Sequence, residues 1–289
     1  MNKNAFVFPL FIPNSSNTCY YAMMYYAMQT LHEVSKGNMN FDVVIYYYGN
    51  NYDIKNHKHF EGNENLFNDF QSIKFIEFPF ERVKASDVYF FKWKCVDHLF
   101  NNYDYDKVFI TDADLIFYGN PGYVFDKYSE DYAHILFEGS DKVVQKVLGR
   151  NGIAGGQIVL SKKLYHNKIK NLYEKISEQR KILLEIASKV LESEGDYNYF
   201  DKLSDQYSLM NALLASDIEL KALSFKDILY GILACNIKVK NEQIIIKPNT
   251  NILHYLGPYA YLFLPDKLKN EEMRKQYRNK IKQDPLIYY

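Results

Sequence analysis

The sequence predicts an α/β fold in which helices cover both faces of a mostly parallel central sheet. Short apolar runs rich in Val, Ile, Phe and Tyr alternate with longer segments of helical pattern over residues 5–117, an order typical of parallel sheets. The chain has 289 residues, of which 47% are hydrophobic, and this is enough to form a full core. It contains no internal repeat and no proline- or serine-rich linker. We therefore expect one domain over residues 1–265, followed by a basic helical tail over residues 266–289.

Each element is expected from a local signal. The apolar segment 5–12 predicts a buried first strand, and residues 14–17 predict the turn that caps a helix over 18–34. The remaining predicted strands cover residues 41–48, 73–78, 108–110, 133–137, 153–161 and 244–246. The remaining predicted helices cover residues 65–70, 89–100, 165–191 with an interruption, 205–215 and 266–283.

Two carboxylates follow the predicted strand 108–110, and a second apolar run over 115–117 follows them. In an extended chain, side chains two residues apart point to the same side, so Asp112 and Asp114 can converge. Paired carboxylates repel each other unless a hard cation such as Mg²⁺ or Mn²⁺ lies between them. Ligands of parallel sheets also bind at the carboxyl ends of the strands. The flanking apolar runs favour a metal site over the alternative, a pair of solvated loop acids.

Other kinds of ion and phosphate site fit the sequence poorly. An EF-hand requires glycine at the sixth position of its loop, where this chain has Phe117. A phosphatase that uses paired aspartates needs a second acidic cluster after a later strand, but the nearest acids, Asp196 and Asp201, follow a charged helix. No G-x-G-x-x-G, Walker or G-x-S-x-G motif is present. Lys plus Arg and Asp plus Glu both total 35, and this balance argues against a nucleic-acid-binding protein.

Five segments resemble, in the expected order, the motifs of glycosyltransferase family 8, whose members have the GT-A fold. They are a helix with a basic residue over 89–93, the DxD segment over 107–121, GIAGGQIVL over 152–160, the Asp-Gln start of a helix over 204–211, and H-x-x-G over 254–257. The resemblance covers residues 5–262. It implies a GT-A-like fold and the transfer of a hexose from a nucleotide sugar, with retention at the anomeric carbon.

By this resemblance, Asp112, Asp114 and His254 would hold Mn²⁺ or Mg²⁺, which bridges the diphosphate of a nucleoside-diphosphate sugar, expected to be UDP-linked. Two carboxylates with an imidazole suit Mn²⁺ somewhat better than Mg²⁺. Ala113 lies between the two acids at the donor, and Gly257 would let the backbone approach the phosphates. The alternative for His254 is a hydrogen-bonded histidine at the end of a strand.

The resemblance assigns three further residues to catalysis. Asp205 would accept hydrogen bonds from sugar hydroxyls, Gln206 would offer an amide oxygen near the anomeric carbon, and Lys92 would neutralise phosphate or position the sugar. The alternatives are a helix N-cap for Ser204 or Asp205, and a solvated helix lysine for Lys92. The acceptor would be a hydroxyl group of a glycan or a lipid-linked glycan.

Donor-binding residues are expected after the first strand and in the glycine-rich segment. Asn17, Tyr20 and Tyr21 would hold the base and ribose, with capping and packing as an equal alternative. Gly155 and Gly156 would let the sugar lie against the backbone, with a bulge or a tight turn as the alternative.

Two positions depart from the pattern of the family. Ala154 stands where the family has asparagine, so Gln157 would supply the missing contact with the sugar. Residues 258–261 read PYAY, without the lysine that usually follows H-x-x-G. Two other classes therefore stay open: a metal-dependent phosphatase or sugar nucleotidyltransferase, and a non-catalytic carbohydrate-binding protein on the same fold.

The tail over 266–289 carries more basic than acidic residues, which fits either a solvated closing helix or peripheral attachment to anionic lipid. The three cysteines, Cys19, Cys95 and Cys235, form no C-x-x-C pair, so a reducing compartment is the default. The first apolar run is too short for a membrane span and is not followed by a signal-peptide cleavage pattern. We therefore expect a cytoplasmic protein, with the tail as a candidate for contact with a membrane surface.

Overall fold

The computed structural model describes residues 3–11, 18–35, 39–48, 73–81, 85–224, 228–230, 237–240, 243–246, 251–255 and 259–283. The helix expected over 65–70 and the donor-binding roles expected for Asn17 and Gly257 lie outside the described residues. None of the helices in the described ranges is long and apolar enough to cross a lipid bilayer.

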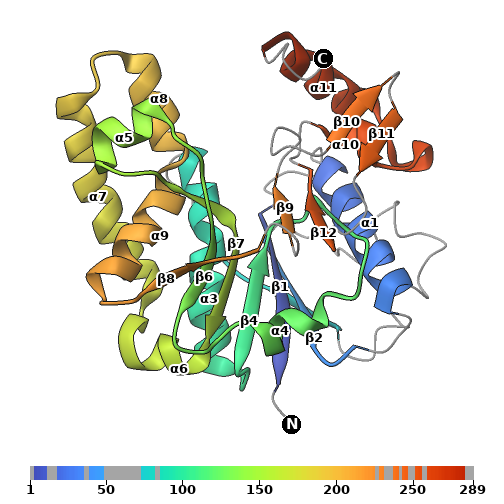
Figure 1. Ribbon diagram of the computed structural model, residues 1–289, viewed down its shortest axis with the longest axis horizontal. Helices are drawn as coiled ribbons and strands as arrows, with labels where there is room; N and C mark the ends of the chain where they lie inside the picture. The colour runs from blue at the N-terminus through green and yellow to red at the C-terminus, as the bar shows by residue number, and fades with distance from the viewer. Residues whose placement is uncertain are drawn as a thin grey trace.

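A seven-stranded sheet forms the centre of the molecule (Figure 1), with the strand order β3-β2-β1-β4-β7-β6-β8. Its strands are β1 (Asn4–Phe11), β2 (Asp42–Tyr48), β3 (Ile73–Glu77), β4 (Lys107–Thr111), β6 (Ala133–Phe137), β7 (Ile153–Ser161) and β8 (Leu220–Ala222). The first four strands in the spatial order are parallel, β7 is antiparallel to both of its neighbours, and β6 and β8 are again parallel. The predicted α/β fold with a mostly parallel sheet is therefore confirmed.

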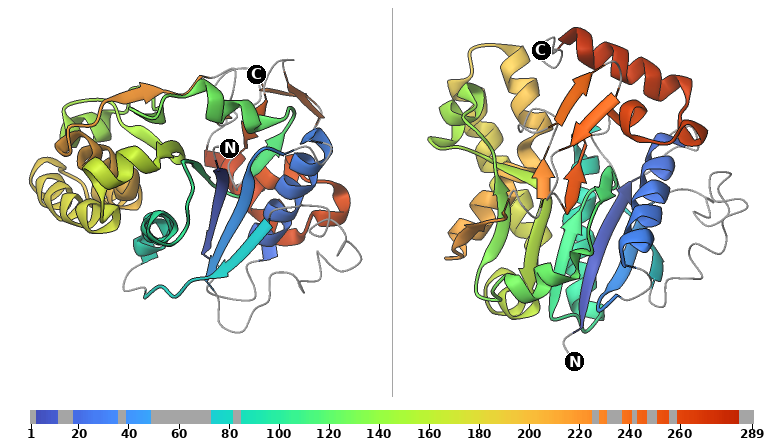
Figure 2. Two further views of the ribbon diagram at one scale, coloured as in Figure 1. Left: turned by 90° about the horizontal axis from the view of Figure 1, so that it is seen from below. Right: turned by 45° about the vertical axis from the view of Figure 1, so that its right-hand side comes forward.

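Helices cover both faces of this sheet, and Figure 2 shows α1 and α3 on opposite sides of the first strands. The long helices are α1 (Thr18–Ser35) on one face and, on the other, α3 (Phe91–Asn102), α7 (Leu172–Val190) and α9 (Ser204–Ala215). In β1, Phe6 and Phe8 belong to the core beneath α1, whereas Ala5 and Val7 belong to the core beneath α3, α7 and α9. This alternation is the pattern of a strand that is buried on both faces.

Shorter helical elements connect these strands and helices within residues 85–202. They are the 3₁₀ segments Ala85–Phe90 and Pro121–Tyr123, and the helices α4 (Val124–Lys127), α5 (Lys142–Leu148), α6 (Lys162–Leu164) and α8 (Glu194–Lys202). The interruption predicted within 165–191 is confirmed, because a π-helical turn precedes Asn171, whose φ of 61° is left-handed, and α7 starts after it. The sequence does not predict α5 and α8, which pack with α7 around a small separate cluster.

A second, three-stranded sheet lies beyond the carboxyl end of β4. Its strands are β5 (Leu115–Phe117), β12 (Ile252–His254) and β9 (Ile228–Tyr230), and β12 in the middle is antiparallel to β5 and parallel to β9. A hairpin of β10 (Ile237–Lys240) and β11 (Gln243–Ile246) follows β9 in the chain. Of these strands the sequence predicts β11 and marks β5 only as an apolar run, because runs of three residues carry little periodic signal.

The tail packs against the rest of the molecule. After α10 (Ala260–Phe263), the helix predicted over 266–283 is split into a 3₁₀ turn, Asp266–Leu268, and α11 (Glu271–Gln283). Figure 2 shows α11 alongside the β10–β11 hairpin. Met273 and Tyr277 of α11 are buried in the core beneath α1. Attachment of the tail to a membrane therefore stays a prediction.

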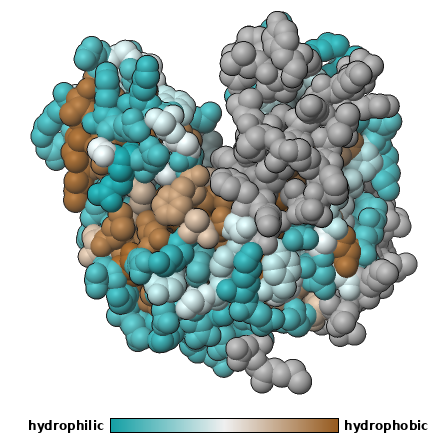
Figure 3. All heavy atoms as spheres, in the orientation of Figure 1, coloured by the Kyte–Doolittle hydropathy of each residue, from teal (hydrophilic) through white to brown (hydrophobic). Residues whose placement is uncertain are grey.

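Hydrophobic side chains also gather at one edge of the surface, where α7 lies (Figure 3). Ile182, Ile186 and Val190 recur every four residues along this helix and are each more than a third exposed. Leu183 and Ala187 on the same helix are buried. None of the exposed three lines the pocket described below.

Candidate active site

The acidic pair lies at the carboxyl end of β4, in the bend that connects β4 with β5. The Asp112 N–H donates to the Gly156 carbonyl 3.1 Å away, which ties the bend to the neighbouring strand β7. The Tyr255 N–H donates to the Asp114 carbonyl, also at 3.1 Å, and the pairing of β12 with β5 fixes the register of His254. Backbone hydrogen bonds thus bring His254 beside two aspartates that are distant in the sequence.

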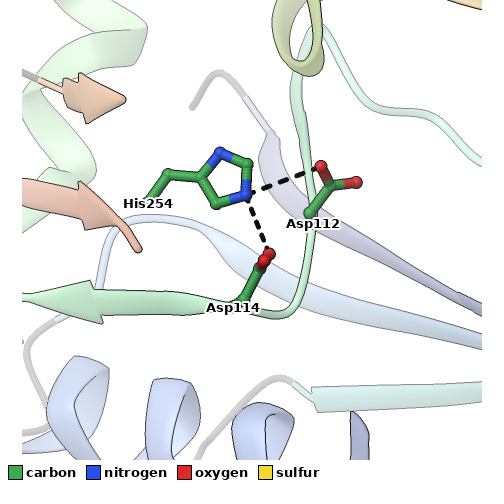
Figure 4. Close-up of side chains that lie close together, drawn as sticks. All are labelled: Asp112, Asp114 and His254. Atoms are coloured by element: carbon green, nitrogen blue, oxygen red, sulfur yellow. Dashed lines mark ion pairs between the residues drawn. The ribbon is translucent and has the colours of Figure 1, made fainter. Parts of the chain in front are cut away.

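Asp112, Asp114 and His254 point toward one another (Figure 4). His254 Nε2 lies 2.9 Å from Asp114 Oδ1 and 3.8 Å from Asp112 Oδ2. One ligand atom from each residue lies within 4.8 Å of the others, and the described part of the chain holds no other such group of three. His254 is buried, whereas Asp112 exposes 40% of its side chain, which leaves one side open to a substrate. Two carboxylates and an imidazole fit a divalent cation.

The close approach of charges shifts the pKa values of this group. Burial raises the pKa of the Asp112 carboxyl, Lys92 and His254 lower it, and Asp114 and Asp205 raise it, so that it lies above its ordinary value. Burial lowers the pKa of His254, but Asp114 and Asp112 raise it above its ordinary value. The rise at His254 comes from the two carboxylates and indicates negative charge that a bound cation would neutralise, whereas burial is the main cause of the rise at Asp112.

Two glycines of β7 leave the space that these side chains occupy. A Cβ atom at Gly156 would lie 2.3 Å from Asp112 Oδ2 and 3.2 Å from His254 Cε1. At Gly155 it would lie 2.5 Å from the Cβ of Gln206. By the resemblance, the donor sugar would occupy the space beside these glycines. In this structure the side chains of Asp112, His254 and Gln206 occupy it. Gly156 also lines the pocket, so its contact with a donor stays a prediction.

Lys92 of α3 faces Asp205 in the first turn of α9. Lys92 Nζ lies 3.1 Å from Asp205 Oδ2 and donates to the Gly155 carbonyl at 2.9 Å. The two side chains are 12% and 6% exposed, so Lys92 is not a solvated helix lysine. Burial lowers the pKa of Lys92, but Asp205 and Asp112 raise it above its ordinary value. Capping by Asp205 is not observed either, because Leu203 occupies the N-cap of α9.

Gln206 connects this ion pair to a carboxylate that the sequence analysis missed. Gln206 Oε1 accepts from the Gly155 N–H at 3.0 Å, and Gln206 Nε2 donates to Glu138 Oε1 at 3.0 Å. The Tyr207 hydroxyl donates to Glu138 Oε2 at 3.2 Å. Burial raises the pKa of Glu138 to about 7, although Tyr207 and Gln206 lower it. Glu138 directly follows β6, which runs in the same direction as β4. Its position directly after a predicted strand, like that of Asp112 after β4, was the signal by which the sequence could have indicated it.

A pocket of about 260 Å³ opens over these residues. Its described walls come from the end of β1, from α1, from α3 with the preceding 3₁₀ segment, from the β4–β5 bend with Asp112, Ala113 and Asp114, and from the start of α9. Tyr20 is 46% exposed and lines it. Tyr21 is buried in the core beneath α1, where burial raises its pKa to about 12. Packing is therefore the observed role of Tyr21, and Tyr20 stays the candidate for the base or ribose.

Two other residues considered in the sequence analysis have definite partners in the structure. Gln157, expected to contact the sugar, is fully buried and hydrogen-bonded to His254 Nδ1, so it lies behind the imidazole. Asp201, part of the acidic cluster that a phosphatase would need, pairs with Arg180 at 3.0 Å and does not join Asp112 and Asp114.

Solved structures of glycosyltransferases share this architecture. The apo form of WbbM, a bifunctional glycosyltransferase, gives a TM-score of 0.53 at 13% identity, over 94% of this chain and 51% of the other. Apo mouse xyloside xylosyltransferase 1 gives 0.52 at 12% identity, over 86% and 97%. The glycosyltransferase GlyE of Streptococcus pneumoniae TIGR4 gives 0.51 at 15% identity, over 99% and 65%. The fold is GT-A-like.

At these identities the similarity establishes the fold alone. No family model matches the chain, and no curated protein matches its sequence. The chain spans 51% of the length of WbbM and 65% of the length of GlyE. Membership of family 8 therefore stays a prediction, and activity, substrates and partners are matters for proposal.

Proposed function

We propose that the protein is a metal-dependent glycosyltransferase that moves a hexose from a nucleoside-diphosphate sugar, UDP-linked by the family resemblance, to a hydroxyl group of a glycan. The observation that carries this proposal is the convergence of Asp112, Asp114 and His254 within 4.8 Å of one another on a GT-A-like fold. Retention at the anomeric carbon rests on the resemblance alone.

The side chains of the site have distinct tasks in this proposal. Asp112, Asp114 and His254 would hold Mn²⁺ or Mg²⁺, and a cation there supplies Lewis-acid stabilisation of the departing diphosphate. Asp205 offers carboxylate oxygen to sugar hydroxyl groups, and its ion pair with Lys92 fixes its position. Lys92 is engaged by a carboxylate already, so it orients Asp205 and adds only part of its charge to the phosphates.

Gln206 is held from both ends of its amide group. Its oxygen accepts from the Gly155 N–H and its nitrogen donates to Glu138, which fixes the amide plane at the edge of the pocket. A carbonyl oxygen has two lone pairs, so Gln206 Oε1 can still face the anomeric carbon. This geometry supports an oxygen that stabilises developing positive charge on the sugar.

Incubation of the protein with a panel of UDP-sugars and Mn²⁺ tests the proposal. We expect release of UDP, and an Asp114→Asn variant that stays folded by circular dichroism but neither releases UDP nor binds it in a Mn²⁺-dependent way. Asp131→Asn is the matched control, because Asp131 is an exposed acid that pairs with Lys163 and is not a member of the metal group. Inorganic phosphate or pyrophosphate as product would instead indicate the phosphatase or nucleotidyltransferase class.

A carbohydrate-binding protein without activity is the remaining alternative. Absence of any donor turnover with Mn²⁺, together with sugar binding, would identify it. A lipid-linked glycan acceptor would bring the protein to a membrane surface, and exposed Lys275, Arg278 and Lys282 of α11 could then contact anionic lipid. Since Met273 and Tyr277 of α11 are buried in the protein, this contact would depend on charge and weaken in high salt.

A further inference from the structure

A buried glutamine lies directly behind the candidate metal ligand His254. Gln157 of β7 is fully buried, and His254 is 3% exposed. The amide nitrogen of Gln157 is 2.9 Å from His254 Nδ1. Figure 4 shows this ring nitrogen on the side of the imidazole that faces away from the two aspartates. The two nitrogens of His254 therefore have separate partners, the amide at Nδ1 and the carboxylates at Nε2.

With the Gln157 amide in the orientation of this structure, the contact indicates which nitrogen of a neutral His254 carries the proton. An amide nitrogen only donates, so His254 Nδ1 must accept. The neutral imidazole then has its proton on Nε2, which donates to Asp114 Oδ1 at 2.9 Å. A metal ion needs the lone pair of Nε2, and this lone pair is absent in that tautomer. Coordination therefore requires the proton to be on Nδ1, with an acceptor opposite it.

The other end of the same amide can provide that acceptor. Gln157 Oε1 is buried and has no hydrogen-bond partner among the described residues. Rotation of the amide by half a turn would bring Oε1 to Nδ1 without breaking any further hydrogen bond to the described residues.

We propose that Gln157 is the positioning residue of the metal site: with a cation bound, its Oε1 accepts from His254 Nδ1–H and directs the Nε2 lone pair at the ion. The inference rests on the metal site of the proposed function. Glutamine suits this task because one uncharged group can donate to the metal-free tautomer and accept from the metal-bound one. A carboxylate could only accept, and would add negative charge beside Asp112 and Asp114.

Calorimetric titration with Mn²⁺ alone tests the role without any need for turnover. Gln157→Met keeps the approximate size but has only a weak acceptor in its thioether sulfur. We expect it to weaken Mn²⁺ binding about 10–100-fold, the usual cost of losing such a partner. Gln157→Glu restores an acceptor and should bind within a few-fold of the unaltered protein or more tightly. Gln145→Met, at an exposed position on α5, is the matched control and should not change the affinity.

Nitrogen NMR of ¹⁵N-histidine-labelled protein provides a second, independent measurement. His254 is assigned by the loss of its signals in His254→Gln. Without metal we expect the proton on Nε2, and with Zn²⁺ as a diamagnetic substitute for Mn²⁺ we expect it on Nδ1. A proton on the same nitrogen in both states, or Mn²⁺ binding by Gln157→Met as tight as that of the unaltered protein, would overturn the role of Gln157 and leave the proposed function standing. Failure of the unaltered protein to bind Mn²⁺ would remove the metal site and this role together.

Discussion

At the scale of single residues, three carboxylates, Asp112, Asp114 and Asp205, line the pocket together with two lysines, Lys92 and Lys202. Asp112 and Asp114 lie on the metal side, and Asp205 already engages Lys92 at 3.1 Å. A nucleoside diphosphate is itself an anion, so the acid pair would repel it unless a cation lay between them. Metal would therefore be a condition for donor binding and not merely an aid to the reaction.

The space at Gly156 gives a test of the metal site in which none of the three ligands is substituted. In Gly156→Ala the new methyl group would meet Asp112 Oδ2 at 2.3 Å and His254 Cε1 at 3.2 Å, so at least one ligand must move. Since a change to a group that positions a metal ligand typically costs about 10–100-fold in metal affinity, we expect a loss of this size for Mn²⁺ in calorimetry. Gly139→Ala, where nothing lies within 4 Å of the added atom, should bind Mn²⁺ normally. Equal affinity in both variants would mean that the ligands do not use this geometry.

Glu138 predicts a pH dependence of folding stability. Its pKa rises from 4.5 to about 7 in the folded protein, so the folded state holds a proton that the unfolded chain has lost. The contribution of this proton to the free energy of unfolding is largest below pH 4.5, the pKa of Glu138 in the unfolded chain, and is lost as the pH rises through about 7. Urea unfolding at about pH 5 and about pH 8 should therefore show that Glu138→Gln gains stability relative to the unaltered protein as the pH increases. A stability difference that does not change with pH would contradict the raised pKa.

The residue pattern predicted some of the site and could not predict the rest. Asp112 and Asp114 were recognisable because their spacing and the flanking apolar runs are local. The partnership of Lys92 with Asp205 joins two helices that the sequence separates widely, and no local pattern encodes that distance. The tautomer of His254 depends on a buried neighbour from another strand, which the sequence alone does not reveal.

At the scale of elements, Arg180 joins the helices that carry the catalytic candidates. Its guanidinium contacts Asp87 in the 3₁₀ segment before α3 at 2.7 Å, Asp201 of α8 at 3.0 Å and Ser204 of α9 at 3.2 Å. Ser204 directly precedes Asp205. The planar guanidinium of Arg180 on α7 therefore fixes the start of α9 relative to the segment that precedes α3, the helix that carries Lys92.

Arg180→Lys should loosen this junction, because a compact ammonium group cannot reach all three partners. We expect the free energy of unfolding to fall by about 2 kcal/mol, and turnover to fall as the position of Asp205 becomes less fixed. Denaturant unfolding and UDP release measure the two effects. Arg150→Lys, at an exposed position after α5, should leave both unchanged. A loss of stability without loss of turnover would mean that α9 holds its position without Arg180.

The elements themselves were predictable in proportion to their length and regularity. β1, β2, β4 and β7 are buried apolar runs, and α1, α7 and α9 repeat apolar residues at helical spacing, so their patterns were clear. β12 has three residues and α5 has seven, too few for a period to stand out. The antiparallel direction of β7 was not encoded locally, because buried strands of either direction have the same apolar pattern.

At the scale of the whole molecule, aromatic contacts connect the C-terminal helices α10 and α11 to the end of β12, the strand that carries His254. Tyr277 of α11 stacks on Tyr261 with ring centres 5.9 Å apart. In α10, Phe263 stacks on Tyr255 at 5.1 Å, and Tyr255 is the residue after His254. A chain of packed rings and buried side chains therefore leads from the C-terminal helix to the candidate metal ligand.

The packing of the tail predicts that α11 is part of the hydrophobic core. A substitution in α11 tests this against a tail whose only role is to contact membranes. Met273 is 1% exposed, so Met273→Ala should leave a cavity and lower the free energy of unfolding by about 3 kcal/mol. Because the cavity lies in the packing that supports β12, Mn²⁺ affinity should fall with it, whereas Arg278→Ala on the exposed side of α11 should change neither quantity. Urea unfolding and calorimetry with Mn²⁺ measure both. If Met273→Ala were as stable as the unaltered protein, α11 would not be part of the core, and surface binding would become the better account of its basic residues.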